Sequence, residues 1–349
     1  LSDSEGVGVW RVIFIDPLLT HRAMARRKSN AVRKITKAER VLLFDVPATA
    51  PGEGNGSLFY IDVARELSKT NRRLMSQAMC YGIESIEFYF TGQPAASSIL
   101  VQAATASDNW VVNNAHVKGQ ALWNQMNDLV LEDNPSIQGT WSDFKVRLDG
   151  GHTAARQLQC RDGSGALLLN GEWAYATYVM PQHEVDPATG LPLPADELTA
   201  ILIGGDTATK RSLVNAYALS RATVQPQDPS VPAGMSTSFF NLLTDSGSQE
   251  PELADVIEAE NDEPPYDQDI YPGQLTNAAL PMDQGVGVAT IGSPMGYIGG
   301  FVAPCALIRL KVTGFDSVGA PLPTNPELIM KINVMPGKYK GVAAIKMGQ

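Results

Sequence analysis

The sequence predicts an all-β protein, a sandwich or jelly roll of two packed antiparallel sheets, with long loops, short helices and a projecting insertion. Roughly eight to ten segments of the 349-residue chain have the composition and alternation of strands. These segments do not alternate with helices, which excludes a doubly wound α/β sheet. The 31 glycines and 23 prolines suit a fold with many turns. We therefore expect a two-sheet sandwich.

The first predicted strand covers residues 41–46, a β-rich run that is closed by a proline and a glycine-rich turn. A short helix is expected over residues 62–74, with Asp62 as its N-cap. A long strand then covers Met79–Phe90. Its apolar residues change parity in the middle, so we expect one extra residue, a β-bulge, near Glu84-Ser85.

The central part of the chain predicts further strands and two helices. The expected strands cover residues 98–104, 144–148, 155–160, 173–179 and 198–203. The expected helices cover residues 122–131 and 209–221. The strand over 173–179 has apolar residues at both parities, which indicates burial on both faces.

The last third begins with residues 224–283, which are rich in proline, serine and acids and have little periodicity. A structureless loop of this length inside a domain is unusual, so we interpret it as an acidic surface insertion or projection. The β pattern resumes over residues 285–298, 306–312 and 328–335. The sandwich or jelly-roll domain is thus expected over residues 41–223 and 284–335. It is followed by a basic C-terminal tail over residues 336–349.

Charge is unevenly distributed along the chain, whose net charge is −10. Residues 1–40 are predicted to form a basic N-terminal arm, because eight cations and a single acid, Glu39, lie between Arg22 and Arg40. The candidate polyanion-binding residues are Arg22, Arg26, Arg27, Lys28, Arg33, Lys34, Lys37 and Arg40. Such an arm suits nucleic acid, and the alternative is a solvated tail without a partner. No lysine or arginine occurs between Arg221 and Arg309.

We find no motif for catalysis or for a cofactor. The glycines of residues 285–290 lack the third glycine of a dinucleotide loop, and there is no phosphate-binding or nucleophile-elbow motif. Thr244–Gly247 resembles the aspartic-protease tripeptide, but it occurs once and lies in the acidic segment, so we expect no catalysis there. The histidines, which lack metal-ligand spacing, are His21, His116, His152 and His183. The widely spaced cysteines, expected to be buried thiols in a reducing compartment, are Cys80, Cys160 and Cys305.

Two partner classes remain to be weighed from composition. The carboxylates from Glu258 to Asp269 offer oxygen ligands for calcium at a subunit contact, but they lack a calcium-loop motif, so a solvated acidic face is favoured. No run of eighteen apolar residues occurs, so we expect no membrane partner. The apolar run over residues 9–15 lacks the layout of a signal peptide.

Several segments together resemble capsid proteins of Rep-encoding circular single-stranded DNA viruses, especially those similar to bacilladnaviruses. The segments that carry the resemblance are Arg33–Arg40, Leu67–Gln77, Tyr81–Ile86, Trp123–Met126, Trp141–Val146, Ser212–Arg221 and Met335–Val342. The resemblance covers roughly residues 33–222 and 306–349. It does not extend to residues 1–20 or to the acidic segment.

The resemblance implies a viral jelly roll that assembles into an icosahedral shell, with the basic arm facing a single-stranded DNA genome. The partners would be other copies of the chain, about 60 or about 180 of them with the larger number favoured, and a host receptor that the sequence does not identify. The protein would be found in the virion, after assembly inside the host cell, in the nucleus.

Two other classes share this fold and stay open as alternatives. A lectin-like β-sandwich explains the strands and the acidic loop but not the basic arm. A jelly-roll enzyme of the cupin type needs histidines and a carboxylate clustered around a metal, and their spacing here offers no such set. Particle size separates a capsid protein from a lectin, which forms a small oligomer.

Overall fold

The computed structural model describes residues 37–52, 55–90, 92, 95–140, 142–180, 196–220 and 280–348. Residues 1–36 and 221–279, which contain most of the predicted arm and most of the acidic segment, lie outside the described residues. The observations below concern the described ranges alone.

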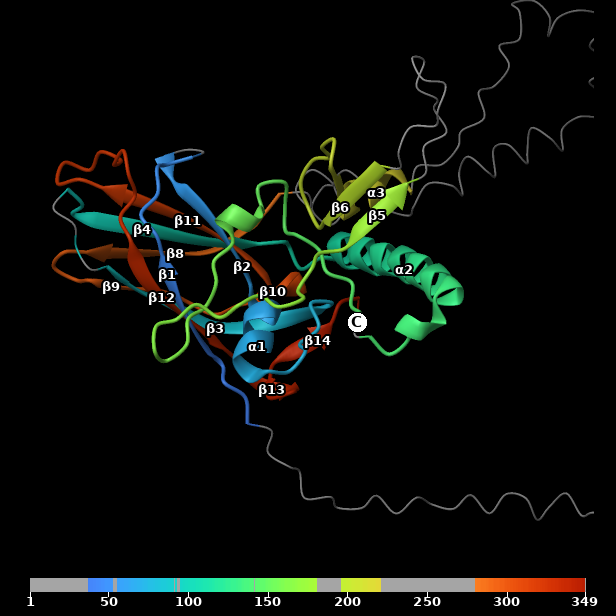
Figure 1. Cartoon of the computed structure of the whole chain (residues 1–349). Helices are drawn as coiled ribbons and strands as arrows, with labels where there is room; N and C mark the ends of the chain where they lie inside the picture. Colours follow the sequence, from blue (N-terminus) through green and yellow to red (C-terminus); the bar gives the residue numbers. More distant parts are fainter. Residues whose placement is uncertain are drawn as a thin grey trace, which may run out of the picture. The chain divides into compact units, whose positions relative to one another are not determined.

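Two antiparallel sheets form the main body (Figure 1). The first sheet has the order β1-β12-β3-β10, and β9 and β14 also pair with β3. Its strands are β1 (Val41–Val46), β12 (Leu328–Val334), β3 (Met79–Phe90), β10 (Phe301–Ala303), β9 (Met295–Ile298) and β14 (Ala344–Lys346). The second sheet has the order β2-β11-β4-β8. Its strands are β2 (Ser57–Asp62), β11 (Leu307–Phe315), β4 (Ser98–Thr105) and β8 (Met282–Thr290).

This strand order is that of a jelly roll. When β9 and β10 are counted together as the sixth strand, the first sheet reads 1-8-3-6 and the second reads 2-7-4-5. Consecutive strands of the jelly roll therefore lie in opposite sheets, except for β4 and β8, which pair in the second sheet, as in two interleaved Greek keys. The predicted fold class is confirmed.

The core lies between the two sheets and follows from strand alternation. In β12 the buried side chains are Leu328, Met330, Ile332 and Val334, while the residues between them are partly exposed. In β3 the inward side chains change parity at Glu84, because Asn333 pairs with Ser85 while Val334 pairs with Ile83. The predicted β-bulge is thus confirmed, and it keeps Ile83 and Ile86 both fully buried.

Helix α1 (Val63–Asn71) connects β2 to β3. The side chain of Asp62 accepts a hydrogen bond from the backbone N–H of Arg65 at 3.0 Å, which confirms the predicted N-cap. The helix ends three residues before the predicted boundary at residue 74, because Arg72 adopts a left-handed conformation with φ 51°.

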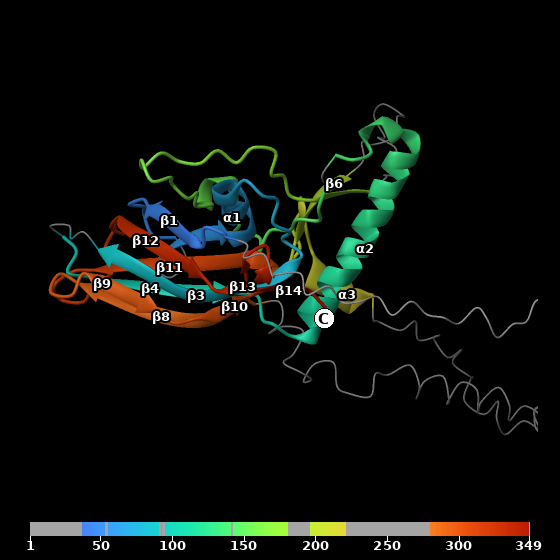
Figure 2. The ribbon, with the colours of Figure 1, turned by 90° about the horizontal axis from the view of Figure 1, so that it is seen from below.

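The connection from β4 to β8 contains a second layer of structure beside the jelly roll (Figure 2). It comprises α2 (Trp110–Asp133), a three-stranded sheet of β5 (Thr177–Met180), β6 (Asp196–Ile201) and β7 (Lys210–Ser212), and α3 (Leu213–Leu219). This layer has its own apolar core, in which Phe144, Val146 and Leu202 are fully buried. The jelly-roll strands lie within residues 41–105 and 282–334, so the part of the predicted range 41–223 that follows β4 belongs to the connection from β4 to β8.

Several predicted elements of this connection differ from the structure. The helix expected over residues 122–131 is 24 residues long and begins after Asn109, whose side chain accepts from the N–H of Val112. The strands expected over 144–148 and 155–160 are reduced to isolated bridges, such as Cys160 with Phe44. The helix expected over 209–221 is split between β7 and α3. These segments pack by tertiary contacts that local periodicity does not encode.

The C-terminal segment is also more ordered than predicted. Residues 336–348 contain β13 (Pro336–Tyr339) and β14, and β14 pairs with the beginning of β3. Val342 and Met347 are buried. The expectation of a basic tail without a core pattern is therefore corrected. The strands are too short to give a recognisable alternation, and the buried side chains belong to residues beside β14.

Candidate functional site: the arm junction and an apolar strand face

The predicted arm joins the body at residues 37–40. The backbone N–H of Glu39 donates to Asn71 Oδ1 at 2.8 Å, and Asn71 Nδ2 donates to the carbonyl of Glu39 at 2.9 Å. The N–H of Val334 donates to the carbonyl of Arg40 at 3.0 Å. The chain is thus fixed between the end of α1 and β12, and we call residues 37–40 the arm junction.

The structure describes two of the eight predicted phosphate-binding residues. Lys37 is exposed. Arg40 is partly buried; its guanidinium donates to the carbonyl of Val334 at 3.3 Å and lies 4.0 Å from the carboxylate of Glu84. The others lie outside the described residues, namely Arg22, Arg26, Arg27, Lys28, Arg33 and Lys34. Arg40 therefore anchors the junction, while Lys37 faces solvent.

A buried ionic cluster fixes α1, the element to which the junction is attached. Glu66 is fully buried and contacts Arg65 Nε at 2.6 Å and Lys69 Nζ at 2.7 Å. It also accepts from the backbone N–H of Cys160 at 2.9 Å. The buried carboxylate of Glu66 therefore has three hydrogen-bond donors. These contacts hold α1 against the segment around Cys160.

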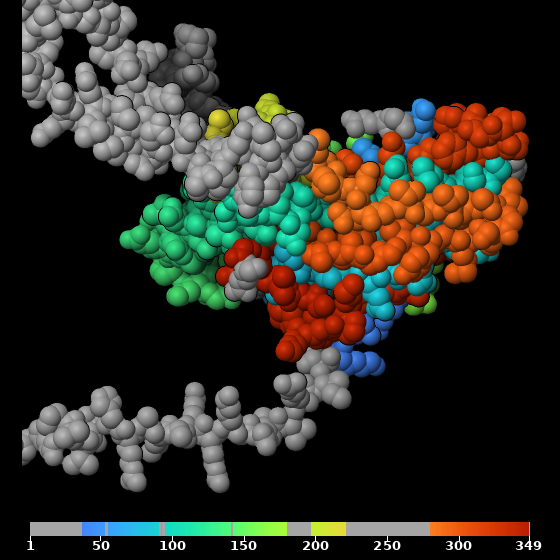
Figure 3. All heavy atoms as spheres, turned by 180° about the vertical axis from the view of Figure 1, so that it is seen from behind, coloured from blue at the N-terminus to red at the C-terminus, as the bar shows by residue number. Residues whose placement is uncertain are grey.

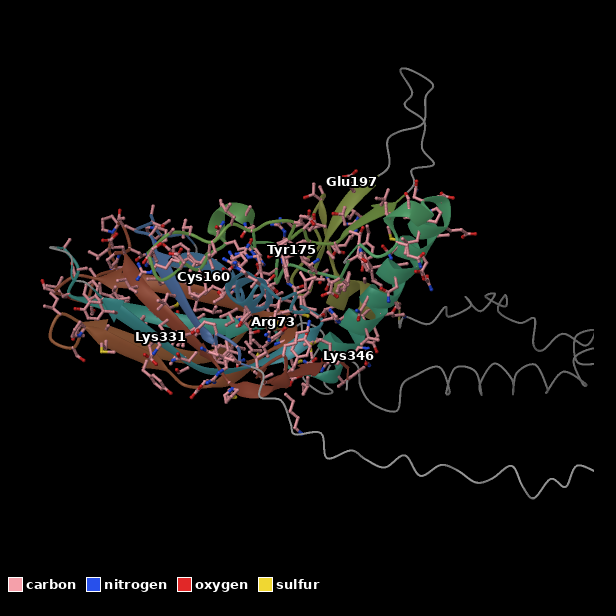
Figure 4. The ribbon with its side chains drawn as sticks, turned by 60° about the horizontal axis from the view of Figure 1, so that its bottom comes forward. Arg73, Cys160, Tyr175, Glu197, Lys331 and Lys346 are labelled. Atoms are coloured by element: carbon pink, nitrogen blue, oxygen red, sulfur yellow. The ribbon has the colours of Figure 1, made fainter. Side chains whose placement is uncertain are left out.

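Asp62, the N-cap of α1, is a second buried anchor. Its side chain accepts from Gln77 Nε2 at 2.8 Å, Trp173 Nε1 at 3.1 Å and the hydroxyl of Tyr175 at 3.3 Å. Burial raises the pKa of Asp62 to about 6, although the positive charge of Arg65 opposes the shift. The carboxyl group thus joins α1 to the connection between β4 and β8, where Tyr175 and Cys160 lie (Figure 4).

The described histidines and cysteines are core residues. His116 and His152 are buried, and desolvation lowers their pKa values to about 4 and about 3, so both are neutral. The thiols of Cys80, Cys160 and Cys305 are free and buried, as predicted. Burial raises the pKa of Cys80 and of Cys160 to about 12, which makes them poor nucleophiles at neutral pH.

The described ranges contain no group of three histidine, cysteine or acidic residues placed to hold a metal ion. Among the same residues, no helix is long and apolar enough to cross a membrane. Four features considered in the sequence lie outside the described residues: His21, His183, the tripeptide in 244–247 and the carboxylates from Glu258 to Asp269.

A broad apolar surface covers the outer side of β8, β9 and β10. Val288 is 55% exposed and Tyr297 is 60% exposed, because alternate residues of these strands point outward. Figure 3 looks onto this side, where residues 282–303 form a wide continuous surface in orange. We call it the apolar strand face, and it consists of Val286, Val288, Ile291, Met295, Tyr297 and Val302. No charged residue occurs from Gln284 to Ile308.

Glycines on the inner side bring these strands against the core. A Cβ at Gly296 would collide with the ring of Phe88, and one at Gly287 would lie 2.7 Å from the same ring. The Phe88 side chain therefore occupies the space where side chains of β8 and β9 would otherwise point. Because the inner side has little side-chain volume, the large apolar side chains of these two strands lie mostly on the outer side.

Helix α2 carries a second exposed apolar region. Its first half is buried against the second core through Val112, Ala115 and His116. Its second half projects from the body (Figure 2), with Leu122 and Leu129 more than half exposed. The body thus offers two apolar surfaces at which other chains could dock.

Comparison with known proteins adds no identification: no protein-family model, curated protein or solved structure matches the chain. The apolar strand face was not among the residues predicted from the sequence. The sequence does contain a signal for this face, namely the absence of charged residues from Gln284 to Ile308. Strands with one exposed side usually carry polar or charged residues on that side. Only the strand order reveals that this side faces outward.

Proposed function

We propose that the chain is a structural capsid protein, which self-assembles into an icosahedral shell and packages a single-stranded DNA genome through non-specific contacts of its basic arm. The observation that carries the proposal is a jelly roll whose outer strands β8, β9 and β10 expose an apolar, uncharged face. The resemblance of the sequence to capsid proteins supports the same conclusion.

The apolar strand face supports assembly on energetic grounds. Burial of apolar surface contributes about 25 cal/mol per Å², and a contiguous exposed patch on a monomer promotes aggregation. Strand β8 ends the second sheet, so its edge is also open to pairing among the described residues. Contact with further copies of the chain would cover both features. The neighbours would be identical subunits, about 60 or about 180 per closed shell, with the larger number favoured.

The arm supports packaging. Lysine and arginine side chains that are close together in a chain contact phosphates and release counterions without reading the bases. The cations between Arg22 and Arg40 have no aromatic residue among them, so base stacking would contribute little. Binding to DNA should therefore be sensitive to salt and tolerant of sequence. The proposed location is the virion, after assembly in the nucleus of the host cell.

The experiment that tests assembly uses the purified full-length chain. Size-exclusion chromatography and negative-stain electron microscopy should show closed particles in the megadalton range. A small oligomer under all assembly conditions would contradict the proposal and favour the lectin-like alternative.

The experiment that tests packaging removes residues 21–40 and measures binding to single-stranded DNA at two salt concentrations. We expect lower affinity and a shallower dependence on salt, by about 0.7 for each phosphate that the arm neutralises in the full-length chain. Unchanged affinity and slope would exclude the arm as the main DNA-binding element.

A further inference from the structure

A second set of cations lies on the folded body, next to the arm junction. Arg72 and Arg73 follow the end of α1, Lys338 and Lys340 belong to β13 and the turn after it, and Lys346 belongs to β14. Arg73 and Lys346 are labelled in Figure 4, which brings this side of the body forward. We call the whole set the basic surface; it comprises Lys37, Arg40, Arg72, Arg73, Lys338, Lys340 and Lys346.

Hydrogen bonds bring the three segments of the basic surface together. On one side, Asn71 holds the arm junction through its two bonds to Glu39. On the other side, Lys340 Nζ donates to the carbonyl of Leu74, and the N–H of Ser76 donates to the hydroxyl of Tyr339 at 2.9 Å. The loop with Arg72 and Arg73 therefore lies between the arm junction and the β13 turn.

The cations of the basic surface form few ion pairs with carboxylates. The described residues form six side-chain ion pairs within 4.0 Å, and five of them involve cations outside the basic surface. The sixth is the long contact between Arg40 and Glu84. No described carboxylate lies within 4.0 Å of the charged nitrogens of the other members, which are Lys37, Arg72, Arg73, Lys338, Lys340 and Lys346. The three segments of the basic surface contain one acid, Glu39, and Arg40 is the member that lies near Glu84.

The backbone holds two of these cations in unfavourable conformations. Arg72 has φ 51° and Lys340 has φ 50°, a region that glycine or asparagine occupies at lower cost. A glycine at either position would allow the same left-handed backbone conformation without a Cβ clash. Lys340 donates to the carbonyl of Leu74, whereas the exposed Arg72 has no described carboxylate within 4.0 Å, which indicates that the charge of Arg72 has a use other than the stability of the turn.

We propose that the basic surface binds the phosphates of single-stranded nucleic acid, continuing the track of the arm onto the folded body. This inference rests on the proposed packaging function. The arm cations precede this surface in the chain, and the last of them, Lys34, is three residues before Lys37. The exposed arginines of the basic surface present planar donor groups that fit phosphate oxygens. Cations held on a folded body lose less conformational entropy on binding than cations on a flexible segment, so they also position the strand.

The competing ligand is an acidic peptide, such as residues 245–269 of a neighbouring copy. The observations favour nucleic acid because the arm cations and Lys37 are consecutive parts of one basic stretch of the sequence, and both would be drawn to a polyanion. An acidic peptide bound there would also compete with any strand that follows the arm. The experiment below separates the two ligands.

The test compares two triple variants of the full-length chain. The first, R72Q/R73Q/K338Q, removes three exposed cations of the basic surface. The matched control, K118Q/R156Q/R211Q, removes one lysine and two arginines that are also exposed but lie elsewhere. Binding of a labelled oligothymidine is measured by fluorescence anisotropy over a series of salt concentrations, below the concentration at which particles form. Thermal unfolding confirms that both variants fold.

We expect the logarithmic salt slope of the first variant to become shallower by about 2, which corresponds to three phosphate contacts at about 0.7 each. The control should keep the slope of the unsubstituted chain. Equal slopes for all three proteins would overturn the inference. Loss of particles by the first variant with an unchanged slope would also overturn it, since that result identifies an acidic peptide of a neighbour as the ligand.

The capsid proposal and the proposal that the basic surface binds nucleic acid can fail separately. If the unsubstituted chain forms particles and binds DNA through the arm alone, the capsid proposal stands and the basic surface has no part in binding. If the unsubstituted chain forms no particles, the capsid proposal fails whatever the slopes show. Particle formation is therefore measured separately, by size-exclusion chromatography.

Discussion

The apolar strand face and the basic surface are both exposed on the same body, yet their chemistry is opposite. The apolar strand face has six large apolar side chains within a run, from Gln284 to Ile308, that has no charge. The basic surface has seven cations, and six of them have no described ion-pair partner. Under the proposed function, the two surfaces have two kinds of partner: protein that buries apolar area, and a polyanion that exchanges counterions.

The two surfaces should respond differently to salt. Burial of apolar area depends little on moderate salt and is strengthened by excluded ions such as sulfate. Phosphate contacts weaken steeply as salt rises. Conditions of high salt should therefore preserve assembly while releasing nucleic acid. Variants that change one surface at a time can therefore separate the two roles.

The largest effect is expected from charges on the apolar strand face. The double variant V288D/Y297D places two carboxylates where contact with a neighbour would desolvate them, at a cost of several kcal/mol each. Particles should be lost, and only free subunits should elute from a sizing column. The subunit itself should stay folded, because both side chains point outward.

The matched control for this variant is Gln284→Asp, a charge on an exposed polar residue of the same strand. It should assemble like the unsubstituted chain. Normal particles from V288D/Y297D would exclude the apolar strand face as a subunit contact.

A smaller effect is expected from the glycines behind that face. Gly296→Ala places a methyl group against the ring of Phe88, and such overpacking costs about 1–3 kcal/mol. The free energy of unfolding in urea should fall by this amount. Gly292→Ala is the control, because a Cβ there has no heavy atom within 4 Å, and its stability should be close to that of the unsubstituted chain.

A comparable effect, dependent on pH, is expected at Asp62, the buried N-cap of α1. The folded-state pKa of about 6 lies above the ordinary value of 3.8, so the folded state binds the proton more tightly than the unfolded state. The stabilisation from this proton is complete below the ordinary value and is lost as pH rises through about 6. The loss is about 3 kcal/mol at about 1.36 kcal/mol per pKa unit.

Asp62→Asn removes the titration and keeps an N-cap acceptor. The difference in unfolding free energy between the unsubstituted chain and this variant should therefore shift by about 3 kcal/mol from about pH 3.5 to about pH 7.5. A difference that does not change with pH would contradict the raised pKa. Glu39→Gln, an exposed carboxylate near the same helix, serves as the control.

The smallest effect is expected at Arg72, where stability and binding should move in opposite directions. Arg72→Gly relieves the left-handed conformation and should raise the free energy of unfolding by up to about 1 kcal/mol. The same change should make the salt slope of DNA binding shallower by about 0.7. If the variant is more stable but the salt slope of DNA binding is unchanged, Arg72 makes no phosphate contact.

The jelly roll could be predicted from the sequence where strands have one buried side. The bulge at Glu84 and the N-cap at Asp62 followed from residue parity and capping chemistry. The connection between β4 and β8 could not be predicted as well. Residues around Val146 are buried without forming a strand, because isolated bridges and side-chain contacts replace a regular ladder.

The candidate surfaces were only partly predictable. The arm cations are adjacent in sequence, so their charge is obvious, and Lys37 and Arg40 are the two that the structure describes. The basic surface joins Arg73 to Lys338 and Lys346, which are more than 250 residues apart in the chain. Their proximity depends on the pairing of β14 with β3 and on the bond from Lys340 to Leu74. Neither contact leaves a periodic signal.

Both surfaces can be tested together in a cryo-electron microscopy map of particles assembled from the full-length chain. We predict that the apolar strand face is buried between subunits and that the basic surface lines the interior, with residues 245–269 on the outer side. A map in which the strand face is bare, or in which Arg73 and Lys346 face the exterior, would contradict the proposed roles of the two surfaces.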